Sequence, residues 1–205
     1  MHMLRMGLTG GIASGKSVVA AILRELGFPV LEADVVAHLL IEPGQPAHDE
    51  VQREFGAGVV GADGRIDRGK LAEVVFADPA KLVRLNQIIH PRVEETVFRQ
   101  LEDWRRQGVR DAGFVVAALL VEARYGDKLD GMVVAFCRPE QQLERLLARG
   151  MSEADAKRRI AVQMPVEEKL RHATDKIDCS GTMEETRAQV QALAERLRGR
   201  KRGIN

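Results

Sequence analysis

The stretch "GLTGGIASGKS", residues 7–17, decides the fold. From Gly10 to Ser17 it fits the pattern G-x-x-x-x-G-K-[ST]. Gly10 and Gly15 allow backbone conformations that a Cβ forbids, so the loop can turn its N–H groups toward phosphate oxygens. The helix that follows would point its positive end at the same place. The stretch therefore predicts a phosphate-binding loop between a strand and a helix.

The residues of this loop have separate expected roles. Lys16 would reach the β- and γ-phosphates as a point charge, and the Ser17 hydroxyl would ligate Mg²⁺. A chance match of four fixed positions occurs in on the order of one chain in a hundred, and the flanking strand and helix make chance rarer still. We therefore expect ATP or GTP to be bound by Gly10, Gly11, Ile12, Ala13, Ser14, Gly15, Lys16 and Ser17.

The composition favours a soluble, cytoplasmic protein. The chain has 205 residues, of which 45% are hydrophobic and 30% charged, and this is enough for one well-buried core. A net charge of +1 gives no reason to expect a nucleic acid or a membrane as partner. Cys137 and Cys179 show no metal-ligand spacing, and the longest apolar run, residues 113–121, is too short to cross a bilayer. The expected assembly is a monomer or a weak homo-oligomer.

The order of apolar and amphipathic segments predicts an α/β fold with a parallel sheet covered by helices. The expected strands are residues 3–10, 28–33, 112–122, 131–137 and 175–181. The expected helices around them are residues 16–27, 35–42, 139–150, 152–164 and 183–199.

The region between about Gln45 and Gly108 has a different pattern. It is mostly helical, and none of its segments is typical of a strand buried on both faces. The sequence "NQIIHPRVEETVFRQLEDWRRQG" predicts a long helix that begins at Pro91, since proline favours the first helical position. We therefore expect a helical insert, with His90 either just before a helix or in contact with a substrate.

Asp34 is the candidate catalytic carboxylate. It follows the second expected strand, so a parallel sheet would place it at the carboxyl edge, near the phosphate loop. There it would accept the proton of an acceptor hydroxyl. The other interpretation is a helix N-cap, a position that Asp favours. Both roles are compatible with the sequence.

The remaining motifs favour a small-molecule kinase. The guanine-binding motif N-K-x-D is absent, and the apolar strand ends in Glu122 where ATP-driven motors have Asp. Arginines of the two helices after residue 138 would close over the transferring phosphoryl as a lid, and Arg145 and Arg149 are the better candidates. The alternative for these arginines, which include Arg158 and Arg159, is a solvated helix face.

The chain resembles the dephospho-coenzyme A kinases. The resemblance runs from Leu4 to about Leu197 and rests on "GLTGGIASGKS", "EADVVAHLLIEPGQPA", "DGRIDRGKLAEVVFADP", "LNQIIHPRV", "ALLVE" and "KIDCSG". It implies a P-loop NTPase core with a five-stranded parallel sheet, made of residues 1–44, 109–138 and 174–205. It also implies a helical substrate-binding insert at residues 45–108 and a helical lid at 139–173. The implied reaction transfers the ATP γ-phosphate to the ribose 3′-hydroxyl of dephospho-CoA.

The resemblance also implies site residues. Asp34 would be the base, Lys16 and Arg145 would act on the transferring phosphoryl, and Arg149 would help to bind ATP. The implied substrate contacts are Asp34, His38, His90 and Glu122.

Four residues depart from the family pattern: Glu32 replaces an Asp, His38 an Arg, Ala118 a Pro and Cys179 an Asn. His38 lacks the fixed charge and bidentate fork of arginine. Two alternatives therefore stay open, a P-loop kinase of another small acceptor, such as a nucleotide or sugar, and a relative that binds ATP without catalysis.

Overall fold

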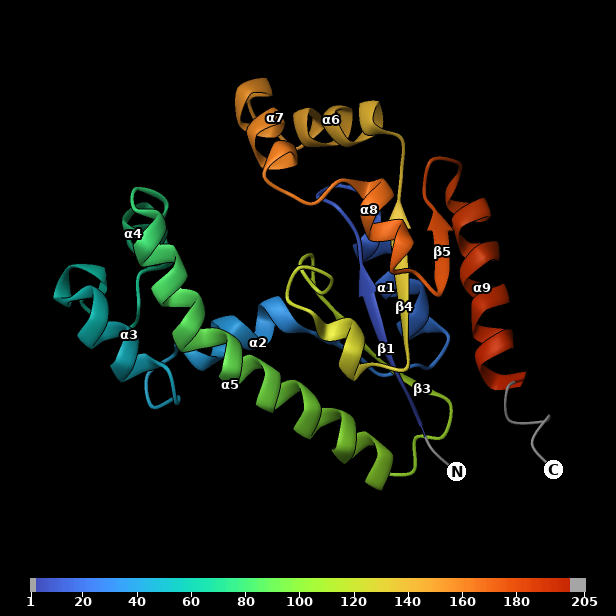
Figure 1. Cartoon of the computed structure of the whole chain (residues 1–205), viewed down its shortest axis with the longest axis horizontal. Helices are drawn as coiled ribbons and strands as arrows, with labels where there is room; N and C mark the ends of the chain where they lie inside the picture. The colour runs from blue at the N-terminus through green and yellow to red at the C-terminus, as the bar shows by residue number, and fades with distance from the viewer. Residues whose placement is uncertain (1–2, 200–205) are drawn as a thin grey trace. The chain divides into compact units, whose positions relative to one another are not determined.

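A central sheet carries the fold. The computed structural model describes residues 3–199, and its strand order is β2-β3-β1-β4-β5 (Figure 1). The strands are β1 (Leu4–Thr9), β2 (Val30–Glu32), β3 (Ala112–Val116), β4 (Gly131–Phe136) and β5 (Asp175–Asp178). The β1–β3, β1–β4 and β4–β5 pairs are parallel. The α/β prediction is confirmed, and so is the five-stranded sheet that the resemblance implied.

The chain divides into two compact units. The first comprises the described residues up to Leu31 and from Asp103 onward, and the second is Glu32–Glu102. Helices of the first unit are α1 (Lys16–Glu25), α6 (Pro139–Ala148), α7 (Glu153–Ala161), α8 (Val166–Arg171) and α9 (Met183–Gly199), with a 3-10 turn at Tyr125–Lys128. The second unit holds α2 (Ala33–Leu40), α3 (His48–Phe55), a 3-10 turn at Ala57–Val59, α4 (Arg68–Phe76) and most of α5 (Pro79–Arg106).

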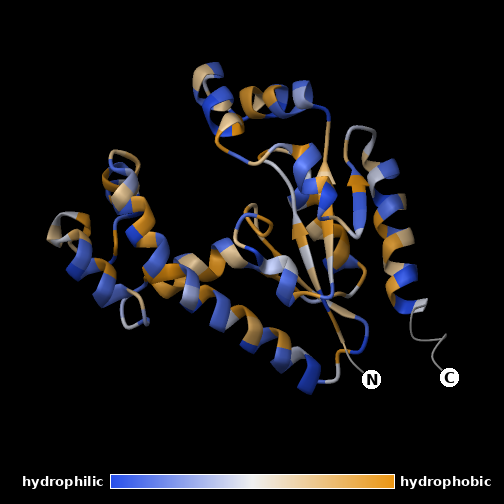
Figure 2. Cartoon of the chain, in the orientation of Figure 1, coloured by the Kyte–Doolittle hydropathy of each residue, from blue (hydrophilic) through white to orange (hydrophobic). Residues whose placement is uncertain are grey.

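The core of the first unit lies between the sheet and helices α1 and α9. The strands contribute residues such as Leu8 and Phe114, and α1 contributes Ile22 and Leu23, all of them buried. Apolar and polar segments alternate along α9 and α5 (Figure 2), as expected for helices with one buried face. Helix α1 ends where Gly27 turns the chain with φ 85°, a conformation suited to glycine.

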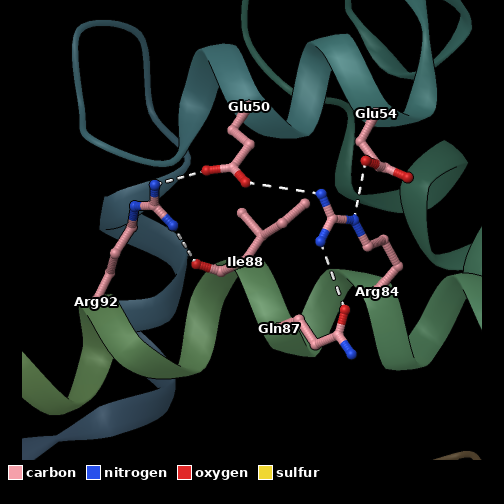
Figure 3. A network of polar contacts seen from close by, with 6 residues as sticks. All are labelled: Glu50, Glu54, Arg84, Gln87, Ile88 and Arg92. Carbon is pink, nitrogen blue, oxygen red and sulfur yellow. Dashed lines mark hydrogen bonds and ion pairs between the residues drawn. The ribbon is translucent and has the colours of Figure 1, made fainter.

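The second unit combines a small apolar core with surface ion pairs. Val51 of α3 and Ile88 of α5 are buried. Across them, the Arg92 guanidinium bonds Glu50 at 2.6 Å and Arg84 bonds Glu54 at 3.0 Å (Figure 3). These side chains are partly exposed, so each pair stabilises the unit by less than about 1 kcal/mol.

Helix α5 corrects one prediction. The sequence pattern placed a helix start at Pro91, whereas α5 begins at Pro79 and contains Pro91 in its interior. Proline removes one backbone hydrogen bond there. The Arg92 guanidinium donates to the Ile88 carbonyl in the preceding turn at 2.6 Å. The helix has buried residues both before Pro91, at Ile88, and after it, at Val93, Val97 and Leu101.

Two further predictions of secondary structure were wrong. Strand β3 ends at Val116, not at Glu122, because the chain turns at residues 118–124 with bonds such as Ala123 N–H to the Leu119 carbonyl. Helix α8 was not predicted, since its short sequence shows too few apolar positions to reveal a period. Within residues 3–199, none of the helices combines the length and the hydropathy needed to cross a membrane.

Candidate functional site

The phosphate loop, residues 10–17, connects β1 to α1 as predicted. Ala13 has φ 58° and Gly15 has φ 100°, so two residues of the loop take left-handed conformations. Such residues within a turn gather backbone N–H groups into an anion-binding concavity. A Cβ at Gly15 would lie 2.6 Å from the Cβ of Cys179, so position 15 requires glycine for space as well as for φ.

The two ends of the loop lie against the sheet. A Cβ at Gly10 would lie 2.3 Å from the Ala135 carbonyl oxygen on β4. The Ser14 side chain is buried, and its hydroxyl has no hydrogen-bond partner among the described residues. A buried hydroxyl without a partner is costly. The loop therefore fits closely on the strands and keeps a polar group unsatisfied in its interior.

The side chains expected to act on phosphate begin α1. Lys16 is the first helical residue and is partly exposed, while Ser17 is exposed. Both lie at the positive end of the helix dipole. The Ser17 hydroxyl is a hard oxygen ligand, which suits magnesium together with phosphate oxygens and water. The residues present therefore fit a magnesium nucleotide.

Side chains of α6 and of Gln163, which follows α7, bond the backbone of the loop. Nη1 of Arg145 donates to the Ala13 carbonyl at 3.1 Å, and Nη2 donates to the Cys179 carbonyl at 2.7 Å. Gln142 and Gln163 bond the backbone of Ile12. Sequence reasoning missed both glutamines, although Gln142 lies one helical turn before Arg145 and so shares its face.

The other arginines have different surroundings. Arg149 is the C-cap residue of α6 and is exposed. Arg158 pairs with Asp155 one turn earlier at 2.7 Å, and Arg159 is exposed. Of the four candidate arginines, only Arg145 is bonded to the phosphate loop among the contacts of residues 3–199.

Glu122 pairs with a buried lysine. Its carboxylate pairs with the Lys169 ammonium at 2.8 Å, and Lys169 has no exposed side-chain surface. The same ammonium donates to the Ala118 carbonyl at 2.6 Å, and the Thr9 hydroxyl donates to that carbonyl at 3.1 Å. These contacts link α8 to the turn after β3 and to the last residue of β1, immediately before the phosphate loop.

Asp34 and His38 lie in α2 of the second unit. The N-cap residue of α2 is Glu32, and Asp34 lies in the first helical turn, so the N-cap interpretation of Asp34 was wrong. The helix starts earlier because the buried Ala33 already belongs to its apolar face. Asp34 is exposed. Burial and the nearby Arg68 lower the pKa of His38, while Asp34 opposes this shift.

His90 also lies in the second unit, in the middle of α5 and not at a helix start. Its pKa is lowered because neighbouring protein atoms displace part of the water around the ring. A neutral imidazole at neutral pH can both donate and accept a hydrogen bond. The neutral His90 ring can therefore form hydrogen bonds with a substrate.

Comparison with known proteins identifies the family. The model of the dephospho-CoA kinase family matches residues 4–185. The chain belongs to the dephospho-CoA kinase family. A dephospho-CoA kinase of Symbiobacterium thermophilum is 46% identical over 188 residues, which are 91% of this chain and 78% of that protein. One from Aquifex aeolicus is 42% identical over 95% of this chain and 98% of its own length.

Solved structures agree with this family. TT1252 from Thermus thermophilus matches with a TM-score of 0.81 and 36% identity, over 95% of this chain and 98% of that one. A dephospho-CoA kinase from Campylobacter jejuni matches with a TM-score of 0.73 and 26% identity, over 96% and 98%. A shikimate kinase from Bacteroides thetaiotaomicron has a TM-score of 0.50 at 13% identity over 96% and 99%, a likeness of fold alone.

Two residues that depart from the dephospho-CoA kinase pattern have structural roles in this member of the family. The Ala118 carbonyl accepts the bonds from Thr9 and Lys169. Cys179 packs its Cβ and sulfur against Gly15, and burial raises the pKa of its thiol to about 11. At neutral pH this thiol is uncharged and acts as a small apolar group.

Proposed function

We propose that this chain phosphorylates dephospho-CoA. The ribose 3′-hydroxyl would attack the γ-phosphorus of ATP, its proton would pass to a carboxylate, and ADP would leave. Family membership over residues 4–185 carries the choice of acceptor. The left-handed residues Ala13 and Gly15, which shape a phosphate-binding loop, support the choice of donor.

The nucleotide is assigned to the first unit. Backbone N–H groups of residues 10–17 would surround the phosphates, except that of Ile12, which is bonded to Gln163, and Lys16 would lie at the β- and γ-phosphates. Arg145, already bonded to the loop at the Ala13 carbonyl, would meet charge that develops on the transferring group. Arg149 would contact ATP when residues 139–173 act as a lid. A magnesium ion held by Ser17 would supply charge neutralisation at the phosphate oxygens.

The acceptor is assigned to α2 and α5. Asp34 is exposed and is not the N-cap residue of α2, so its carboxylate is available as the proton acceptor. His38 and His90, whose pKa values are both lowered, would contact the acceptor as neutral rings. The Glu122 carboxylate is already paired with Lys169. Its proposed role is to hold the turn after β3 in the shape that the substrate contacts.

The proposed setting is the cytoplasm, where thiols stay reduced. Cys137 and Cys179 are both buried and unpaired, as is usual for proteins of reducing compartments. The solubility of a chain with 30% charged residues fits the same setting. A monomer or a weak homo-oligomer remains the expected assembly.

Release of ADP across a panel of acceptors tests this proposal. The panel contains dephospho-CoA, AMP, shikimate, gluconate and water alone, each with Mg²⁺ and ATP. We expect ADP only with dephospho-CoA, at one ADP per CoA formed. Release with another acceptor but not with dephospho-CoA would identify a different small-molecule kinase. Binding of ATP without release under any condition would show a non-catalytic relative.

A further inference from the structure

Two glutamines fix the backbone of one phosphate-loop residue from both sides. The Ile12 N–H donates to Oε1 of Gln163 at 2.7 Å, and Nε2 of Gln142 donates to the Ile12 carbonyl at 2.8 Å. Gln142 belongs to α6, and Gln163 follows the end of α7. They lie 130 and 151 residues from Ile12 in the sequence, so the contacts are built by the tertiary fold.

The contacts adjoin the strained part of the loop. Ala13 follows Ile12 and has φ 58°, a conformation that a residue with a Cβ rarely adopts. The carbonyl on its N-terminal side is bonded by Gln142 and its own carbonyl by Arg145. Strained residues persist where the surrounding structure over-determines them. The bonds from α6 therefore hold Ala13 in the conformation that shapes the anion-binding concavity.

These contacts are specific to the two positions. Gln141, the neighbour of Gln142, instead donates to the Ser180 carbonyl at 2.9 Å and caps the start of α6. Gln107, also in the first unit, is exposed on a turn after α5. Neither side chain is bonded to the phosphate loop among the contacts of residues 3–199. Since Gln141 is the neighbour of Gln142 and yet bonds Ser180, a position at the start of α6 does not by itself account for the bond to Ile12.

We propose that Gln142 and Gln163 are positioning residues that hold the phosphate loop in its nucleotide-binding conformation. They act through the Ile12 backbone and need no contact with the substrate. Because they reside on residues 139–173, a displacement of α6 or α7 also releases the loop. The affinity for ATP therefore depends on the position of residues 139–173 relative to the phosphate loop. The kinetic consequence rests on the proposed function, whereas the conformational consequence does not.

Hydrogen exchange of the Ile12 amide tests the conformational part. Gln163→Met keeps the side-chain length and removes the acceptor, so the amide of the nucleotide-free protein should exchange about three to ten times faster. Gln163→Glu restores an acceptor and should restore the protection. Gln107→Met is the matched control and should exchange at the wild-type rate. A wild-type rate in Gln163→Met, or lost protection in Gln163→Glu, would overturn the inference.

Steady-state kinetics test the kinetic part. Gln142→Met and Gln163→Met should each raise KM for ATP about three- to tenfold while KM for dephospho-CoA stays at the wild-type value. A general loss of structure would raise both values and lower the melting temperature, and that outcome would refute a positioning role. If the wild-type protein is inactive, the proposed function fails, and the exchange rates still decide whether the glutamines hold the loop.

Discussion

The phosphate loop of the first unit and the helices of the second unit are held in different ways. The loop depends on left-handed residues, a close glycine–cysteine approach and side-chain bonds to its backbone from α6 and from Gln163 after α7. The second unit depends on a small apolar core and on partly exposed ion pairs between α3 and α5. The contacts of the loop fix the positions of its atoms, which suits phosphoryl transfer. The second unit tolerates change on its surface, which suits a region that adapts to an acceptor.

The largest effect is expected at the loop. Lys16→Ala should lower kcat/KM by about a thousandfold or more, because it removes a charge at the transferring phosphoryl. The melting temperature should stay near that of the wild type, since Lys16 is partly exposed. Kinetics and a melting curve on one preparation measure both. Normal turnover by a folded variant would remove the loop from the mechanism.

Asp34→Asn should have the next largest effect and tests the second unit. Asp34 is exposed and is not the N-cap residue of α2, so loss of its carboxylate should leave the melting temperature unchanged. As the proposed base it should reduce kcat by about a hundredfold to ten-thousandfold. Full activity of this variant would show that another group accepts the proton.

Arg145→Ala should lower kcat by about ten- to a hundredfold. The guanidinium bonds the Ala13 and Cys179 carbonyls, so its removal also loosens the loop. The exposed Arg159→Ala is the matched control and should leave kcat near the wild-type value. If Arg145→Ala and Arg159→Ala lowered kcat equally, the loss could not be attributed to the contacts of Arg145 with the loop.

Glu122→Gln should destabilise the first unit by about 1–3 kcal/mol, because it leaves the buried Lys169 ammonium without its counter-charge. The control is Glu25→Gln, which breaks the exposed pair with Arg187 and should cost less than about 1 kcal/mol. Urea unfolding measures both. A smaller cost at position 122 than at position 25 would argue against a stabilising pair between Glu122 and the buried Lys169.

The smallest expected effect is a pH-dependent change in the free energy of unfolding, and it arises from His48 in the second unit. Nδ1 of His48 faces Asp49 and Nε2 faces the Gly64 carbonyl, each at 2.9 Å. Only the protonated ring donates to both, and these bonds raise the pKa of His48 above its ordinary value.

The stability from this protonation should be complete below about pH 6.5, the ordinary pKa, and should be lost as the pH rises through the higher folded pKa. The free energy of unfolding of wild type minus that of His48→Gln, measured between pH 5 and 9, should therefore fall with pH. A difference that grows with pH would show that the neutral ring is the stabilising form.

The sequence predicted some features of the fold and the site but not others. The phosphate loop was predictable because its motif combines fixed glycines with a flanking strand and helix. The start of α5 was not, because Pro91 is an apparent start signal that packing along Val93 and Val97 overrides. Gln142, Gln163 and Lys169 were missed because their partners lie far away in the sequence, where spacing carries no signal.

We propose that the first unit holds ATP while Asp34 of the second unit serves the acceptor. Calorimetric titration of MgATP into Asp34→Asn, beside Lys16→Ala, tests it most directly. We expect a wild-type Kd for Asp34→Asn and a Kd at least about tenfold weaker for Lys16→Ala, which loses a charge-assisted phosphate contact. Equal weakening of ATP binding by the two substitutions would contradict this division of roles.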